Sequence, residues 1–125
     1  MKQNTIKKNL LIVDDNEDSR IIAIEILNQL DLIILEAGCA KDALKLFHIF
    51  HKEIFLVIID LRLPDFDGYE LLEQVRHINP TVKAIAMSAI DPSEFAARSK
   101  IAGFNACLSK PLNFDKFLKI VKEYS

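Results

Sequence analysis

Five residues that can bind a cation or a phosphoryl group each stand at the end of a short apolar run. They are Asp14, Asp15, Asp60, Ser88 and Lys110. Carboxylates without a His or Cys partner are hard oxygen ligands, which favour Mg²⁺ or Mn²⁺ over zinc. A Lys ammonium can pair with a phosphoryl oxygen, a Ser hydroxyl can donate a hydrogen bond to another, and an Asp can accept a phosphoryl group. These residue types indicate divalent-cation and phosphoryl chemistry.

The apolar runs that precede these residues are typical of buried parallel strands, because they are short and aliphatic and do not alternate with polar residues. The expected strands cover residues 9–13, 32–35, 54–59, 82–87 and 105–109. In doubly wound sheets, ligands bind at the carboxyl ends of the strands, where the strand order reverses. The candidate residues are therefore expected at one crevice.

Segments with helical periodicity separate the strands. They cover residues 17–30, 40–50 and 114–124, one segment that begins at Asp67, and one that runs from Asp91 to Gly103. Asp67 and Asp91 are each followed three residues later by Glu, which is the spacing of a capping box. Five strands that alternate with five helices predict an α/β fold with a parallel sheet, for which the flavodoxin-like order 2-1-3-4-5 is suited.

Composition predicts a single globular domain. The chain has 125 residues, of which 50% are hydrophobic and 27% charged, and we expect a polar extension at residues 1–8 followed by the domain at residues 9–125. The longest apolar run, residues 54–59, is far shorter than the roughly 20 residues that span a bilayer. A net charge of −2 argues against direct binding to DNA or to a membrane. Cys39 and Cys107 are interpreted as free thiols of a cytoplasmic protein.

In four motifs the chain resembles a response-regulator receiver domain (CheY-like family) of two-component signalling. These motifs are LIVDDNE at residues 11–17, IIDLRLPDFDGYE at 58–70, MSA at 87–89 and LSKP at 108–111. The likeness spans about residues 9–124, and the strand order 2-1-3-4-5 is that of this family. The flavodoxin-like fold and a phosphorylation-controlled signalling role follow from the resemblance as expectations.

The resemblance also implies a role for each site residue. Asp60 accepts a phosphoryl group from a sensor histidine kinase or a histidine phosphotransfer protein. Asp15 and Asp60 bind Mg²⁺ directly, Asp14 acts through water, and Arg62 contributes its backbone carbonyl. Ser88 moves toward the phosphoryl group and Lys110 pairs with it.

Three further expectations come from the same resemblance. The peptide bond between Lys110 and Pro111 is cis. The face formed by the fourth helix, fifth strand and fifth helix binds a downstream protein. Cys107 stands where the family often has a Tyr or Phe that acts as a rotameric switch, so that coupling by a swinging ring is in doubt, with Phe104 as a nearby substitute.

Other candidate residues have simpler interpretations. His48 and His51 lack a third ligand and are read as surface residues, and both cysteines as small buried residues. The last helix is expected to bury Phe114, Phe117 and Tyr124, and partner contacts are expected at Phe95 and Ile120.

The resemblance favours a stand-alone receiver that is a monomer or weak dimer and has no enzymatic turnover. Two other classes of protein are alternatives to it. An aspartyl-phosphate hydrolase needs a second Asp two residues after the nucleophile, where this chain has Arg62. A flavodoxin needs a hydroxyl-rich phosphate loop in place of Asp14 and Asp15. A third alternative is that the chain is a receiver excised from a hybrid histidine kinase or a larger regulator.

Overall fold

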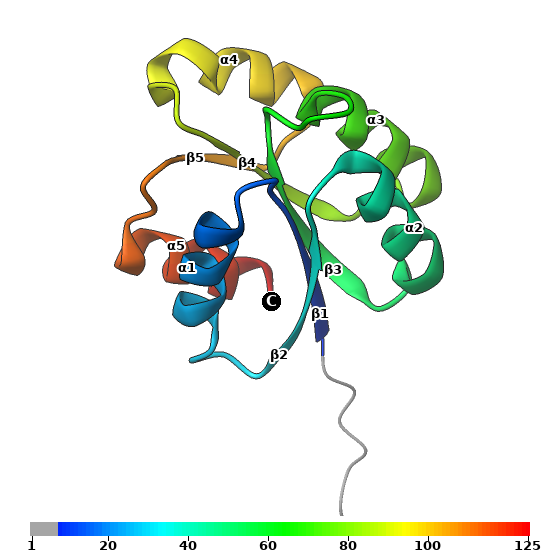
Figure 1. Ribbon diagram of the computed structural model, residues 1–125, viewed down its shortest axis with the longest axis horizontal. Coiled ribbons are helices and arrows are strands. Elements are labelled where there is room, and N and C mark those ends of the chain that lie inside the picture. The colour runs from blue at the N-terminus through cyan, green and yellow to red at the C-terminus, as the bar shows by residue number, and fades with distance from the viewer. Residues whose placement is uncertain (1–7) are drawn as a thin grey trace, which may run out of the picture.

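Five strands alternate with five helices in the computed structural model, which describes residues 8–125 (Figure 1). The strands are β1 (Lys8–Val13), β2 (Leu32–Ala37), β3 (Ile54–Asp60), β4 (Lys83–Ser88) and β5 (Ala106–Ser109). The helices are α1 (Glu17–Leu27), α2 (Ala40–Phe50), α3 (Gly68–Ile78), α4 (Pro92–Ala102) and α5 (Phe114–Tyr124). The predicted N-terminal extension lies outside the described residues except for Lys8, which is the first residue of β1.

The sheet is parallel and its strand order is β2-β1-β3-β4-β5, so that the predicted fold class is confirmed. Helices α1 and α5 cover one face, and α2, α3 and α4 cover the other (Figure 1). The order reverses between β1 and β3, which are neighbours although β2 separates them in sequence. This places the residues after β1 beside the end of β3.

Successive residues of β1 enter two different core layers. Leu10 and Ile12 pack toward α1 and α5, whereas Leu11 and Val13 pack toward the helices of the opposite face. All four side chains are fully buried. From Leu10 to Val13 the strand is therefore entirely apolar, because helices cover both of its faces.

The predicted helix caps are present. Asp67 Oδ1 accepts a hydrogen bond from Glu70 N at 2.9 Å, and Asp91 Oδ1 accepts one from Ser93 N at 2.9 Å. Gly103 follows α4 with a φ of 105°, a left-handed conformation that suits glycine at a helix end. None of the helices in residues 8–125 combines the length and apolar character needed to cross a bilayer.

Several predicted side-chain positions on the helices are wrong. Phe114 is 46% exposed although it was expected in the core, and Phe95 is only 5% exposed although it was expected at the surface. Phe95 packs in the core between the sheet and its helices. Ile120 is half-buried against the opposite core layer, and Tyr124 is half-buried there as well. The errors at Phe114, Phe95 and Ile120 concern which face of a helix turns inward, and this depends on how the helix lies against the sheet.

Two smaller differences concern α1 and the cysteines. α1 ends at Leu27, earlier than the predicted residue 30, and its buried residues are Ala23, Ile26 and Leu27. Cys39 and Cys107 are free but only half-buried. Cys39 is the N-cap of α2, since its Sγ accepts a hydrogen bond from Asp42 N at 3.4 Å.

Candidate functional site

A lysine and two aspartates from three strands meet at the carboxyl edge of the sheet. The Nζ atom of Lys110 lies 2.8 Å from Asp14 Oδ2 and 2.7 Å from Asp60 Oδ2. Asp14 directly follows β1, Asp60 ends β3, and Lys110 directly follows β5. The parallel topology brings together groups that lie far apart in the sequence, as predicted.

Asp15 adds a third carboxylate. One oxygen from each of Asp14, Asp15 and Asp60 lies within 4.8 Å of the others. Asp14 is fully buried and Asp60 nearly so, whereas Asp15 is exposed. Two carboxylates about 4 Å apart repel each other by roughly 4 kcal/mol at an effective dielectric constant of 20. A cation bound there would relieve this repulsion, and the donors are all hard oxygens.

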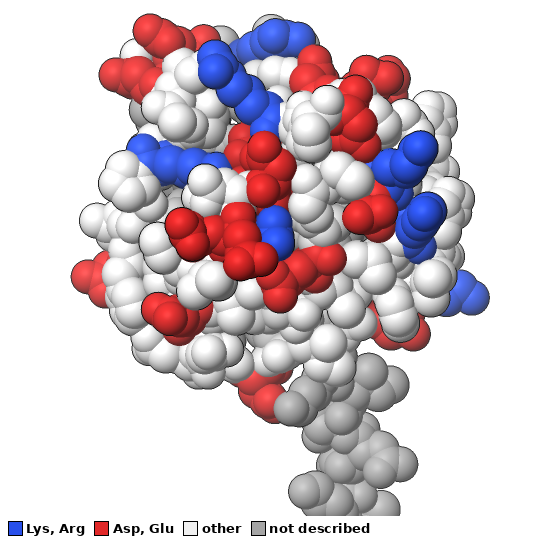
Figure 2. Space-filling view, in the orientation of Figure 1, with Lys and Arg blue, Asp and Glu red and all other residues white. Residues whose placement is uncertain are grey.

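The surface around this crevice is acidic. Figure 2 shows Asp and Glu side chains gathered across this face, over the carboxyl ends of the central strands, with Lys and Arg side chains mainly around them. The near-neutral total charge of the chain therefore conceals a local concentration of negative charge. Such a patch attracts cations more strongly than the total charge of −2 indicates.

Backbone amides hold the two buried carboxylates in place. Asp60 Oδ1 accepts a hydrogen bond from Arg62 N at 2.9 Å, and Asp14 Oδ1 accepts one from Asn16 N at 3.0 Å. The second oxygen of each carboxylate is thereby left for Lys110. The loops after β1 and β3 thus determine which carboxylate oxygens face the crevice.

Burial and pairing change the acidity of this cluster. Burial raises the pKa of Asp60 above 3.8, against the lowering effects of Lys110 and of the Arg62 amide, and the charge of Asp14 raises it further. Burial alone would lower the pKa of Lys110, but hydrogen bonds and charges from Asp14 and Asp60 outweigh it and raise this pKa above 10.5. Lys110 is therefore positively charged at neutral pH.

Ser88 ends β4 at the same sheet edge and is 2% exposed. Its Oγ accepts a hydrogen bond from Ile90 N at 3.1 Å. Within residues 8–125 the hydroxyl has no other hydrogen-bond partner, so its proton remains available for a ligand. The neighbouring peptide bond between Lys110 and Pro111 is cis, as the resemblance implies.

The sequence model described as the response regulator receiver domain matches residues 10–122. The chain belongs to this family. It is 28% identical over 119 residues to sporulation initiation phosphotransferase F of Bacillus subtilis (strain 168), covering 95% of this chain and 94% of that protein. It is 29% identical over 116 residues to the sensor histidine kinase RcsC of Escherichia coli (strain K12), covering 93% of this chain but 12% of that protein.

A solved structure agrees with this assignment. The receiver domain protein (CheY-like) from Methanospirillum hungatei JF-1 matches with a TM-score of 0.82 and 30% identity, covering 94% of this chain and 93% of that one. The chain is thus a receiver domain over nearly its whole length, with a phosphoacceptor role in two-component signalling.

Cys107, for which the resemblance implies an aromatic switch position, is half-buried. Phe104, the expected substitute, is buried and packs edge-on against Tyr69, with the ring centroids 6.0 Å apart. The hydroxyl of Tyr69 lies 3.3 Å from Ser99 Oγ on α4. The aromatic pair therefore connects the start of α3 with α4 and β5.

Asp65 is a structural residue of the receiver that sequence analysis missed. It lies in the loop between β3 and α3, and its carboxylate accepts hydrogen bonds from Ala40 N at 2.9 Å and Lys41 N at 2.8 Å. Desolvation of the carboxylate raises the pKa of Asp65, but these hydrogen bonds from backbone amides outweigh it and lower the pKa below 3.8. The loop after Asp60 is thereby attached to the N-terminus of α2.

Replacing Asp65 with Ala should destabilise the protein by about 1 kcal/mol at pH 7, the usual cost of losing a helix cap. The folded-state pKa is lowered, so this stability is present above pH 3.8 and disappears as the pH falls through the folded-state value. Urea unfolding of both proteins at pH 7 and at low pH measures the effect. A difference that does not shrink in acid would contradict this role.

Gly68 is a second position whose importance the sequence did not reveal. A Cβ at this position would lie 2.7 Å from the carbonyl oxygen of Asp60 and 2.9 Å from Leu61 Cα. Both contacts involve backbone atoms that cannot rotate away. Glycine thus allows α3 to start directly against the strand that carries Asp60.

Gly68→Ala should therefore destabilise the receiver by about 1–3 kcal/mol, as overpacking does in a tightly packed site. Thermal unfolding gives the value. Gly38→Ala is the matched control, because a Cβ at Gly38 would meet only the end of the Arg20 side chain at 3.5 Å. Equal destabilisation of the two variants would show that close contact at Gly68 is not the cause.

The remaining metal-ligand candidates stay apart from the crevice. Among residues 8–125, the aspartate cluster is the one group that brings at least three carboxylate, imidazole or thiolate ligands within reach of one ion. His48 is exposed, as interpreted, whereas His51 is half-buried and its ring centroid lies 6.3 Å from that of Phe47.

Proposed function

We propose that Asp60 is the phosphoacceptor of this receiver and that Mg²⁺ or Mn²⁺ binds beside it. Asp15, Asp60 and the backbone carbonyl of Arg62 would hold the ion, with Asp14 acting through water. The observation that carries the proposal is the meeting of Lys110 with two buried carboxylates, one of which ends the central strand β3. Bound Mg²⁺ would neutralise charge on the phosphoryl oxygens.

We infer the transfer step from the side chains that meet at the crevice. A carboxylate oxygen of Asp60 attacks the phosphorus of a phosphohistidine, the P–N bond breaks, and the imidazole leaves with its electron pair. The ammonium of Lys110 pairs with a phosphoryl oxygen as the charge moves onto Asp60. The hydroxyl of Ser88 donates a hydrogen bond to another phosphoryl oxygen.

The partners follow from this chemistry and from the relatives. We infer that a sensor histidine kinase or a histidine phosphotransfer protein supplies the phosphoryl group, in line with the named relatives. A downstream protein then recognises the α4–β5–α5 face, and neither DNA nor a membrane is bound directly. We place the receiver in the cytoplasm as a monomer or weak dimer, with no catalysis beyond its own phosphorylation and dephosphorylation.

Acetyl phosphate provides a direct test. Incubation with Mg²⁺ should place one phosphoryl group on the receiver, and borohydride reduction followed by peptide mapping should locate it at Asp60. Removal of the metal with EDTA should suppress uptake, and added Mg²⁺ or Mn²⁺ should restore it. Labelling of another residue, or labelling that is insensitive to EDTA, would overturn the proposed site.

A further inference from the structure

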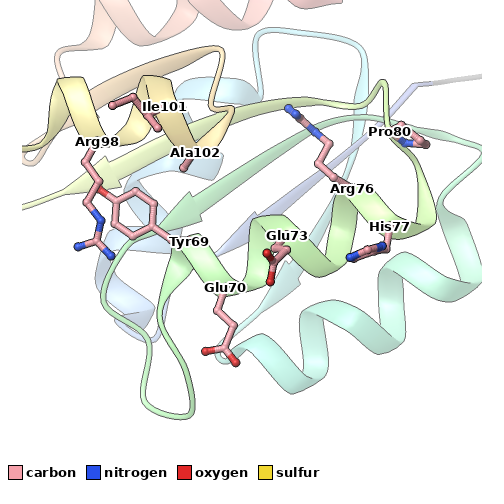
Figure 3. Close-up of a pocket in the computed structure, with 9 residues that line it drawn as sticks. All are labelled: Tyr69, Glu70, Glu73, Arg76, His77, Pro80, Arg98, Ile101 and Ala102. Atoms are coloured by element: carbon pink, nitrogen blue, oxygen red, sulfur yellow. The ribbon is translucent and has the colours of Figure 1, made fainter.

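A groove of about 670 Å³ lies between α3 and α4, beside the α4–β5–α5 face. Figure 3 shows Tyr69 and Arg76 contributed by α3, and Arg98 and Ile101 contributed by α4. These side chains offer both charge and apolar surface. The receiver chemistry described above uses none of them.

Two guanidinium groups of the groove are held in place by uncharged neighbours. Arg98 is stacked on the ring of Tyr69, with its Cζ 4.1 Å from the ring centroid, and Arg76 Nη2 donates a hydrogen bond to Asn105 Oδ1 at 3.2 Å. Arg76 Nε is buried without a hydrogen-bond partner. Among residues 8–125, neither guanidinium forms an ion pair with a carboxylate. A planar guanidinium that is already held in place is well suited to bind a carboxylate.

The rest of the groove restricts what such a ligand can be. Ile101 is 87% exposed, and the exposed Ala102 and Pro80 also line the groove, so that aliphatic groups can be buried there. Glu70 and Glu73 line the α3 side, where they would repel a ligand with many negative charges. The complementary ligand has one carboxylate next to aliphatic side chains.

We propose that the α3–α4 groove is a second docking surface, which binds a segment of a partner protein carrying a single acidic residue flanked by aliphatic side chains. The acidic side chain pairs with Arg98 at the Tyr69 stack, and the aliphatic side chains cover Ile101. Arg76 supplies further donors at the other end of the groove.

The position of Tyr69 and Arg98 connects this surface with the phosphorylation crevice. Both residues also line a second cavity of about 300 Å³, whose wall includes Ser88 and Phe95. The Tyr69–Arg98 stack therefore separates the groove from Ser88. Movement of Ser88 toward a phosphoryl group changes this cavity and hence the position of Arg98. This coupling rests on the proposed function, whereas docking itself does not.

Nuclear magnetic resonance of the ¹⁵N-labelled chain of 125 residues tests the docking. The probe is a synthetic amphipathic helical peptide, blocked at both ends, with leucines on one face and one glutamate beside them. Its matched control has glutamine in place of the glutamate. Addition of the glutamate peptide should shift the amide signals of α3 and α4 most strongly, and the glutamine peptide should bind more weakly.

Variants separate the charged from the apolar contribution. Arg98→Gln should weaken binding of the glutamate peptide about three- to tenfold, the usual effect of losing one hydrogen bond at an exposed site, and should leave the glutamine peptide unaffected. Ile101→Ser should weaken binding of both peptides, and Lys119→Gln on α5 should weaken neither. Absence of binding, or shifts confined to β5 and α5, would overturn the proposal. Groove shifts that appear on concentrating the free protein would instead assign the surface to a second copy of the chain.

A phosphorylated sample tests the coupling separately. Acetyl phosphate with Mg²⁺ should change the peptide affinity by at least about fivefold, a usual size for coupling between two sites. The Asp60→Asn variant should bind the peptide but show no such change. Unchanged affinity in a sample that mass spectrometry shows to be phosphorylated would overturn the coupling. Lack of phosphorylation would count against the proposed function, and docking would still be judged from the untreated protein.

Discussion

Replacing Asp60 with Asn is expected to abolish phosphoryl uptake while leaving the fold intact. The amide has nearly the shape of the carboxylate, and its oxygen can still accept the hydrogen bond that Arg62 N donates to Asp60 Oδ1 at 2.9 Å. It is a poor nucleophile, however, and no longer provides a negative charge for the cation. Phosphoryl transfer from acetyl phosphate, followed by mass spectrometry, measures the loss.

Asp67→Asn is the matched control for this experiment. Asp67 ends the loop that follows Asp60 and caps α3 through Glu70 N, and Asn is an equally good N-cap. The control should take up phosphate at the rate of the unmodified protein. Comparable uptake by Asp60→Asn and the unmodified protein would contradict the assignment of the acceptor.

The Asp60→Asn variant also has a predictable effect on the stability of the protein. Burial raises the folded-state pKa of Asp60 above the value of 3.8, so the ionised side chain disfavours folding. This penalty is absent below pH 3.8, grows as the pH rises above it, and is complete above the raised pKa. Without added metal, Asp60→Asn should therefore be at least as stable as the unmodified protein at pH 7, and its relative stability should decrease toward acid pH.

Lys110→Met is expected to slow phosphoryl uptake by about 10²- to 10³-fold, the usual effect of removing one group that stabilises developing negative charge. It should also destabilise the protein at pH 7 by roughly 1–3 kcal/mol. This is less than for a fully buried ion pair, because the Lys110 side chain is 19% exposed. Methionine keeps much of the aliphatic length, so that lost charge is the main change.

The pH dependence distinguishes lost charge from lost packing. Because Asp14 and Asp60 raise the pKa of Lys110, its contribution to stability is fully present below pH 10.5 and is lost as the pH rises through the folded-state value. The stability difference between the two proteins should therefore shrink in alkaline solution. Lys119→Met, on the exposed side of α5, is the control. A difference that stays constant with pH would indicate packing instead of charge.

The positions of Asp14, Asp60, Ser88 and Lys110 could be predicted from the sequence because each follows a recognisable apolar strand. In a parallel sheet, all strands end at the carboxyl edge, so a residue at the end of a strand lies at that edge. The strand order itself came from the resemblance to receiver domains. The caps at Asp67 and Asp91 were predictable for a similar reason, since they depend on residues within one helical turn.

The features that were missed depend on contacts between segments far apart in the chain. Whether Phe95 or Phe114 turns inward depends on how α4 and α5 rotate against the sheet, and a polar pattern on so short a helix does not determine this. The two backbone amides that Asp65 caps precede it by 24 and 25 residues, so no local motif marks it. The stack of Arg98 on Tyr69 likewise requires that α3 and α4 be neighbours.

The hydrogen bonds around the crevice are distributed unequally, and this gives the receiver one fixed wall and one adjustable wall. The fixed wall is the loop after Asp60, which Asp65 ties to α2 and Gly68 packs against the strand itself. On the opposite wall, the side chain of Ser88 is held by a single bond from Ile90 N. A change at the crevice should therefore be accommodated in the segment from β4 into α4, while the positions of β1, β3 and α2 stay as a common reference in both states.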